Sequence, residues 1–156
     1  MKKHEPNYIA YFDGATEPVN PGGACGIGSL ILDSLKNRLL EYSHFIPMNK
    51  SNSNNVAEYL AFIKILEWFE ENEITNKTIL IYGDSMLVVK QMNNQWRIKK
   101  GLYKKYALKA KNILSSLKSK NNIIIKWISR DYNYLADELS KHELINHKIE
   151  FRLQPI

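Results

Sequence analysis

The sequence predicts an α/β protein with a mixed sheet, and the order of its elements is the first observation that indicates this class. Three strand-like segments precede a long helix, and two further strands then alternate with helices, in the order β-β-β-α-β-α-α-β-α. The second observation is a change of apolar period at Asn54, from that of a strand to that of a helix. No repeat and no Pro-rich or Gly/Ser-rich linker divides the chain, which predicts one domain.

The first three strands are predicted from short aromatic and β-branched runs. Tyr8–Phe12 is such a run and is expected to end at Asp13, followed by turn material in Gly14–Gly23. Ile27–Leu32 and Leu39–Ile46 then predict the two arms of a hairpin or meander.

A helix is predicted over residues 54–72, because apolar side chains recur there at three- and four-residue steps. Asn54 or Asn55 is expected to cap it. The apolar positions are Val56, Tyr59, Leu60, Ile63, Leu66 and Phe69.

The second half of the chain alternates between strands and helices. The segments are a strand at Thr78–Tyr82, a short helix at Ser85–Met92, a helix at Leu102–Leu117, a strand at Ile123–Ile128 and a helix at Tyr132–Glu143. We therefore expect one folded domain over residues 1–143 and a C-terminal tail over residues 144–156.

The composition favours a polyanionic partner. The 156 residues carry a formal charge of +6, and a basic protein gains binding free energy when phosphates release their counterions. A merely soluble basic protein would show the same charge. Cys25 is the only cysteine, which excludes an intramolecular disulfide and favours a reducing compartment. No signal peptide and no apolar run of membrane-spanning length is visible, so we expect a cytoplasmic monomer that does not contact membranes.

Four acidic residues fall near the ends of predicted elements. Asp13 follows the first strand and Asp84 the fourth, so both emerge at one edge if those strands are parallel neighbours. Glu58 and Asp137 lie in the first halves of two helices. Taken singly, each has an ordinary explanation as a turn residue, a helix cap, a helix-dipole acid or a solvated side chain.

Taken together, the four acids indicate a metal site. Clustered carboxylates repel each other unless a cation neutralises them, and Mg²⁺ binds through a few carboxylates and substrate phosphates. Two such ions can clamp the attacking and leaving oxygens of a phosphoryl displacement. That chemistry needs no nucleophilic side chain, so the absence of a Ser/His/Asp arrangement is no objection.

Four motifs, in order along the chain, give the sequence a resemblance to type 1 ribonuclease H. They are Tyr11-Phe12-Asp13-Gly14-Ala15 with Asn20-Pro21-Gly22-Gly23, then Asn54-Asn55-Val56-Ala57-Glu58-Tyr59, then Gly83-Asp84-Ser85, and finally Asn133 to Asp137 with Leu139. The match covers about Asn7 to Lys141. The resemblance implies a ribonuclease H-like fold whose five-stranded mixed sheet has the order 3-2-1-4-5, with strand 2 antiparallel.

The resemblance also implies roles for individual residues. Asp13, Glu58, Asp84 and Asp137 would hold two Mg²⁺ ions, with Mn²⁺ as a possible substitute, and hydrolysis would leave a 5′-phosphate and a 3′-hydroxyl. Glu58 would accept a hydrogen bond from a ribose 2′-hydroxyl. The substrate would be an RNA–DNA hybrid. Its contacts would come from Asn54 and Asn55 in the minor groove, from backbone near Asn20, and from Trp96, Lys99 and Lys100 on the DNA strand.

Two of these implied contacts compete with structural explanations. Asn54 and Asn55 would also serve as simple helix caps. Trp96 could stack on a DNA sugar beside the lysines, or it could anchor a solvated helix face in the core.

The loop before the last helix departs from the common bacterial pattern. It reads Ser129-Arg130-Asp131-Tyr132, without the mobile His that this loop usually supplies. It resembles the archaeal-type branch, which implies that Arg130 takes over the supporting catalytic role.

Two other functions remain open. One is a non-catalytic hybrid-binding protein that keeps the fold, although a mere binder gains nothing from carboxylates that face phosphates. The other is a DNA-cutting nuclease of the same superfamily, against which the Asn54-Asn55 pair argues.

Overall fold

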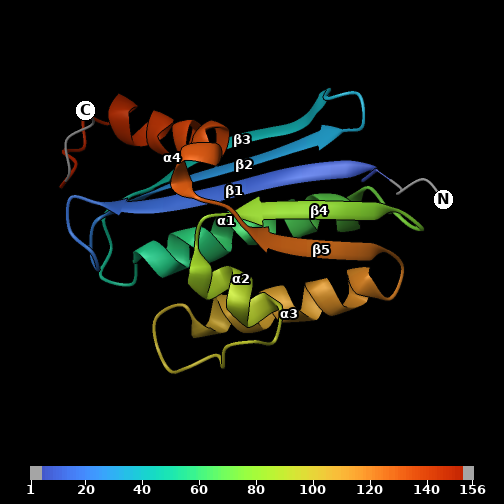
Figure 1. Ribbon diagram of the computed structural model, residues 1–156. Helices are drawn as coiled ribbons and strands as arrows, with labels where there is room; N and C mark the ends of the chain where they lie inside the picture. The colour runs from blue at the N-terminus through green and yellow to red at the C-terminus, as the bar shows by residue number, and fades with distance from the viewer. Residues whose placement is uncertain (1–4, 153–156) are drawn as a thin grey trace.

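A computed structural model describes residues 5–152 of the chain (Figure 1). Its strands are β1 (Tyr8–Glu17), β2 (Ala24–Asp33), β3 (Arg38–Ile46), β4 (Thr78–Gly83) and β5 (Asn122–Trp127). Its helices are α1 (Asn54–Glu71), α2 (Met86–Met92), α3 (Lys104–Lys118) and α4 (Tyr134–Asn146), with a 3₁₀ turn at Arg130–Tyr132.

The five strands form one mixed sheet in the order β3-β2-β1-β4-β5. β1 pairs antiparallel with β2 and parallel with β4, β2 pairs antiparallel with β3, and β4 pairs parallel with β5. The predicted α/β class, strand order and antiparallel second strand are therefore confirmed. Because β1 and β4 run in the same direction, their carboxyl ends meet at one edge of the sheet.

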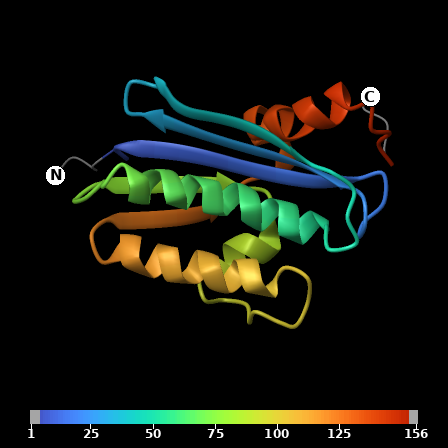
Figure 2. The same cartoon turned by 180° about the vertical axis from the view of Figure 1, so that it is seen from behind.

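Helices cover the two faces of the sheet unequally. α1 and α3 lie on one face, seen in front of the strands in Figure 2. α4 lies on the opposite face, over β1, β2 and β3 (Figure 1). The main core forms between the sheet and α1, where Phe12, Phe62 and Ile81 are fully buried and the rings of Phe12 and Phe62 meet edge to face.

α4 approaches β2 closely because β2 carries glycine where the helix crosses it. A Cβ on Gly26 would lie 1.8 Å from the Ser140 carbonyl oxygen, and a Cβ on Gly28 would lie 2.4 Å from the Ala136 carbonyl oxygen. Ala136 and Ser140 are fully buried on the facing side of α4. The two glycines therefore set the distance between α4 and the sheet, and with it the position of Asp137.

Two element boundaries differ from the prediction in ways that affect the site. β1 does not end at Asp13 but continues to Glu17, because β2 keeps pairing with it from Gly28 to Ala24 after β4 has ended. The expected turn in 14–23 is accordingly shorter. α4 begins at Tyr134 and ends at Asn146, so residues 144–146 of the expected tail are helical. Residues 153–156 of that tail lie outside the described residues.

Within residues 5–152, no helix has the length and apolar character that a membrane crossing requires.

The packing of α4 on β2 makes a stability prediction. We expect Gly26→Ala to lower the free energy of unfolding by about 1–3 kcal/mol, because the added methyl group forces the helix away from the sheet. Urea unfolding monitored by circular dichroism measures this change. Ser115→Ala on the exposed side of α3 is the control and should change the value by less than about 0.5 kcal/mol. An unchanged midpoint for Gly26→Ala would contradict the packing described here.

Candidate active site

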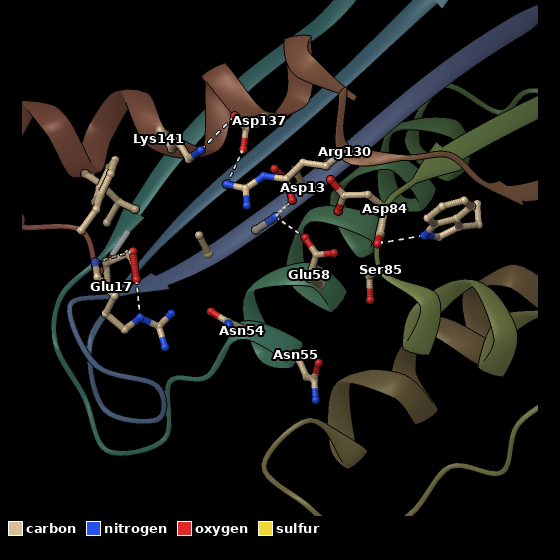
Figure 3. Close-up of a pocket in the computed structure, with 16 residues that line it drawn as sticks. Asp13, Glu17, Asn54, Asn55, Glu58, Asp84, Ser85, Arg130, Asp137 and Lys141 are labelled. Atoms are coloured by element: carbon tan, nitrogen blue, oxygen red, sulfur yellow. Dashed lines mark hydrogen bonds and ion pairs between the residues drawn. The ribbon is translucent and has the colours of Figure 1, made fainter. Parts of the chain in front are cut away.

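Three of the four predicted acids meet at the edge of the sheet. Asp13, Glu58 and Asp84 each present a carboxylate oxygen, and these oxygens all lie within 4.8 Å of one another. They line an open cleft of about 950 Å³, which Asn54, Asn55, Arg130 and Asp137 also line (Figure 3). The sequence therefore located the acids correctly at one edge, although it placed Asp13 at a strand end that the strand does not have.

Asp13 lies at the point where β1 stops pairing with β4 but continues to pair with β2. Phe12 is the last residue of β1 that pairs with β4, whereas Asp13 still pairs with Gly28 of β2. The carboxylate is 7 % exposed and accepts a hydrogen bond from its neighbour Gly14 N at 2.9 Å. The departure of β4 thus opens the space into which Asp13 points.

Glu58 reaches Asp13 because α1 packs directly on the backbone of Gly14. A Cβ on Gly14 would lie 2.3 Å from the Ala57 carbonyl carbon, so only glycine permits this approach. The same approach lets Gly14 N donate a hydrogen bond to Glu58 Oε1. Glu58 is 6 % exposed, although it lies in the first turns of its helix.

Asp84 follows β4 and is fixed by its surroundings on two sides. Its carbonyl oxygen accepts a hydrogen bond from Trp127 Nε1 at 3.1 Å, and Ser85 begins α2 by accepting from Val88 N at 3.3 Å. Asn133 lies on the other side, fully buried, and its Nδ2 donates to the Phe12 carbonyl oxygen at 2.9 Å. Asn133 Oδ1 has no hydrogen-bond partner among the described residues.

The cluster strongly favours the protonated forms of its acids. Burial raises the pKa of Asp13 to about 8. The hydrogen bond with Glu58 is the next largest influence and lowers this pKa, whereas the charges of Asp84 and Asp137 raise it. Burial, followed by the charge of Asp13, raises the pKa of Glu58 well above its ordinary value. Burial also raises the pKa of Asp84, although Asn133 and Arg130 act in the opposite direction.

Asp137, the fourth predicted acid, is neutralised by neighbouring cations. Its carboxylate lies 3.0 Å from Lys141 Nζ and 3.8 Å from an Arg130 guanidinium nitrogen (Figure 3). Asp137 remains close enough to Asp13 to raise its pKa. Arg130, which is 66 % exposed, thus reaches the acid cluster from the 3₁₀ turn, as expected for the loop before the last helix.

The donor set fits a hard divalent cation. Three carboxylates with raised pKa values share one small region, and only a positive charge relieves their repulsion when they ionise. Oxygen ligands of this kind suit Mg²⁺ or Mn²⁺, since carboxylate oxygens are the donors that these ions prefer. Asn133 stabilises the ionised form of Asp84, because its side-chain amide hydrogen bonds to that carboxylate.

Asn54 is oriented by hydrogen bonds and does not cap its helix. The cap of α1 is Ser53, whose side chain accepts from Val56 N at 3.2 Å, so the capping explanation for Asn54 and Asn55 is wrong. Asn54 Oδ1 accepts from Thr16 N at 2.8 Å, and Asn54 N donates to Asn20 Oδ1 at 2.9 Å. The side-chain nitrogen Asn54 Nδ2 therefore points away from Thr16, and it makes no hydrogen bond among residues 5–152. Asn55 is exposed on the wall of the cleft.

Trp96, Lys99 and Lys100 lie outside this cleft, on the loop between α2 and α3. α2 ends at Met92 and α3 begins at Lys104, so these three residues belong to an irregular segment and not to a helix face. Trp96 is 46 % exposed, which contradicts the alternative that it is anchored in the core. Both lysines are exposed.

Sequence reasoning missed two residues of the site. Lys141 stands four residues after Asp137 on the same helix, a spacing that places two side chains on one face and could have revealed the pair. Asn133 belongs to the fourth motif, but nothing in the sequence indicates that its amide would be buried between Phe12 and Asp84.

The fold and the acid cluster together define a protein of the type 1 ribonuclease H class. The model of the reverse transcriptase-like family matches residues 11–143. The chain belongs to this family, which confirms the resemblance carried by the four motifs.

Solved structures of type 1 ribonucleases H are similar over almost the whole chain. The compost-derived LC11-RNase H1 in complex with an RNA/DNA hybrid is 31 % identical, with a TM-score of 0.78, over 90 % of this chain and 99 % of that one. RNase H1 of Halobacterium salinarum is 27 % identical, with a TM-score of 0.74, over 89 % of this chain and 98 % of that one.

One curated relative has no described activity. The uncharacterized protein YpeP of Bacillus subtilis is 30 % identical over 94 % of this chain and 63 % of its own length. The chain thus spans less than two thirds of that relative.

The raised pKa of Asp13 predicts how stability depends on pH without metal. Between the ordinary carboxyl value of 3.8 and about 8, the folded protein retains a proton that the unfolded chain has lost. The stability from this group is therefore full at low pH and declines as the pH rises through that window. Thermal unfolding in EDTA across this range should show the decline.

Asp13→Asn and Mg²⁺ should both counteract this loss. The variant removes one of the crowded charges, so its metal-free melting temperature at pH 8 should exceed that of the unmodified protein. Mg²⁺ should raise the melting temperature of the unmodified protein more than that of the variant, because the ion binds the folded state. Severe unfolding of Asp13→Asn would instead show that Asp13 is a structural residue.

Proposed function

We propose that this protein is an endoribonuclease that hydrolyses the RNA strand of RNA–DNA hybrids and acts as a monomer. The observation that carries the proposal is the cluster of Asp13, Glu58 and Asp84 in an open cleft whose wall carries the outward-facing amide of Asn54. A cleft with clustered acids repels phosphates unless cations are bound there, so the arrangement suits metal-dependent phosphoryl chemistry. The similarity to LC11-RNase H1, solved with an RNA/DNA hybrid, supports the choice of substrate.

Asp13, Glu58, Asp84 and Asp137 would hold two divalent ions, with Mg²⁺ as the expected metal. When bound, such ions lower the pKa of water and neutralise the charge that develops on the phosphate oxygens. In the hydrolysis, water oxygen forms a bond to phosphorus, the bond from phosphorus to O3′ breaks, and O3′ takes a proton. The products are a 5′-phosphate and a 3′-hydroxyl.

The protein's own contribution is to hold the acids in place before any cation arrives. The Gly14 backbone N–H holds the Glu58 carboxylate. Hydrogen bonds from Asn133 and Trp127 hold the backbone of Phe12 in β1 and of Asp84 after β4. The glycines of β2 set the position of α4. Preorganised charges of this kind cost no rearrangement during the reaction. Arg130, which lies beside Asp137, would assist at the same phosphate in the role that a mobile His takes in other family members.

Recognition of RNA would rest on the wall of the cleft. Glu58 can accept a hydrogen bond from a ribose 2′-hydroxyl, the group that distinguishes RNA from DNA. Asn54 and Asn55 can donate to minor-groove acceptors, and the β1–β2 turn with Asn20 lies beside them. Trp96, Lys99 and Lys100, on their exposed loop, would contact the sugar-phosphate backbone of the DNA strand.

The proposed activity predicts selective, metal-dependent cleavage. We expect the protein with Mg²⁺ to cut only the RNA strand of an end-labelled hybrid, and EDTA to abolish cutting. Asp84→Asn should reduce the rate by at least about 100-fold, since it removes one charged group from the cluster. The panel includes double-stranded DNA and double-stranded RNA of the same sequence.

Other outcomes of this panel correspond to the two rival functions. Equal cutting of double-stranded DNA would overturn the proposal in favour of a DNA nuclease of the same superfamily. Binding of the hybrid by folded protein, without cutting under Mg²⁺ or Mn²⁺, would instead indicate a binding protein.

Asn54→Asp tests recognition separately from catalysis. The new carboxylate can still accept the hydrogen bond from Thr16 N, so the fold should be retained. It cannot donate to a minor-groove acceptor and it adds a negative charge near the phosphates. We expect KM for the hybrid to rise about tenfold while kcat changes less, measured in steady-state cleavage assays. An unchanged KM would show that Asn54 does not contact the substrate.

A further inference from the structure

The loop that carries Arg97, Lys99 and Lys100 has little regular structure of its own. Its first part is held by Gln95 N and Trp96 N, which donate to the Lys90 carbonyl oxygen at 2.8 and 3.2 Å. Beyond that point, within the described chain, the backbone of residues 97–100 makes two hydrogen bonds. Both of them lead to the same group of buried side chains.

That group is a chain of hydrogen bonds through Tyr59, Gln91 and Tyr103. Gln91 Nε2 donates to the Arg97 carbonyl oxygen at 3.0 Å and to the Tyr103 hydroxyl at 3.0 Å. The Tyr103 hydroxyl in turn accepts from Lys99 N at 3.1 Å. Tyr59 donates to Gln91 Oε1 at 2.6 Å, and its ring lies parallel to that of Tyr103.

The orientations of the Gln91 amide and of the Tyr59 hydroxyl in this network are determined. The Arg97 carbonyl can only accept, so the Gln91 amide nitrogen must face the loop and its oxygen must face Tyr59. The Tyr59 hydroxyl must then be the donor. Tyr59 and Gln91 are completely buried and Tyr103 is 9 % exposed. Buried polar groups that are paired in this way favour one geometry, because breaking one of these hydrogen bonds leaves an unsatisfied group.

The network also connects the loop to the acid cluster. Tyr59 follows Glu58 on α1, and Gln91 lies on α2, which begins directly after Asp84 and Ser85. The position of the loop is therefore set by α1, which carries Glu58, and by α2, which directly follows Asp84 and Ser85.

We propose that the Tyr59–Gln91–Tyr103 network positions residues 97–100 against the DNA strand and thereby registers the hybrid over the acid cluster. Tyr103 and Gln91 are positioning residues in this view, since they act through the backbone of Arg97 and Lys99. The inference rests on the proposed function. In this view, the loop binds the hybrid because the buried network holds its backbone in place, and not through the charges of the lysines alone.

Tyr103→Phe tests the network with a minimal change. The ring and its contact with Tyr59 remain, whereas the acceptor of the Lys99 amide is lost. We expect KM for the hybrid to rise about two- to tenfold, the size expected for one hydrogen bond, with little change in kcat. Faster hydrogen exchange of the Lys99 amide should accompany this rise. Tyr106→Phe is the matched control, because Tyr106 lies in the first turn of α3, three residues after Tyr103, and its hydroxyl makes no hydrogen bond within residues 5–152.

A double-mutant cycle separates positioning from a general loss of stability. Lys99→Ala with Lys100→Ala should weaken hybrid binding and reduce its salt dependence in the unmodified protein, because fewer phosphates are neutralised. The same pair should have a smaller effect in the Tyr103→Phe background, where the loop is no longer held. Additive effects of the two changes would overturn the inference. Gln91→Met, which removes both donors of the amide, serves if Tyr103→Phe does not fold.

The outcomes distinguish this inference from the proposed function. Unmodified protein that does not cut the hybrid would overturn the proposed function, and the inference would fall with it. Unmodified protein that cuts, together with Tyr103→Phe that matches Tyr106→Phe in KM and in Lys99 amide exchange, would overturn the inference alone.

Discussion

The repulsion among three clustered carboxylates, two of them buried, is the constraint on which the rest of the structure depends. Asp13 and Glu58 are almost completely buried although each carries a charge when ionised, and burial of like charges costs free energy that the fold must supply elsewhere. The surrounding contacts supply it through close backbone packing at Gly14 and a buried amide at Asn133. The large apolar core between α1 and the sheet holds the elements against this repulsion. A protein of this kind trades stability in its free form for a preformed cation site.

Much of the fold was predictable because local patterns and topology agree. The strands and helices have the periods expected from their burial, and the alternation of strands and helices after α1 requires parallel pairing through crossovers. The placement of Asp13 and Asp84 at one edge follows from that topology. The choice between a cap and a substrate contact at Asn54 was not predictable, because Ser53, Asn54 and Asn55 are all good capping residues and only the structure shows which one accepts from Val56 N.

The remaining differences have a common physical cause, which is that tertiary partners override local signals. The Gly- and Pro-containing segment after Asp13 has the composition of a turn, yet its first part stays extended because β2 continues to pair with it. The network of Tyr59, Gln91 and Tyr103 joins residues 32 and 12 positions apart, and no period or motif connects them. Lys141 was within reach of sequence reasoning through its four-residue spacing from Asp137.

The hydrogen bond from Asn133 to the Phe12 carbonyl has a consequence for biosynthesis. It joins residues 121 positions apart, and the contact of Ser140 with Asp13 spans 127 positions. Synthesis proceeds from the N-terminus, so β1 and β4 leave the ribosome before Asn133 and Ser140 do. The contacts that α4 makes with the acid cluster therefore form only after this helix, the last of the described chain, has emerged.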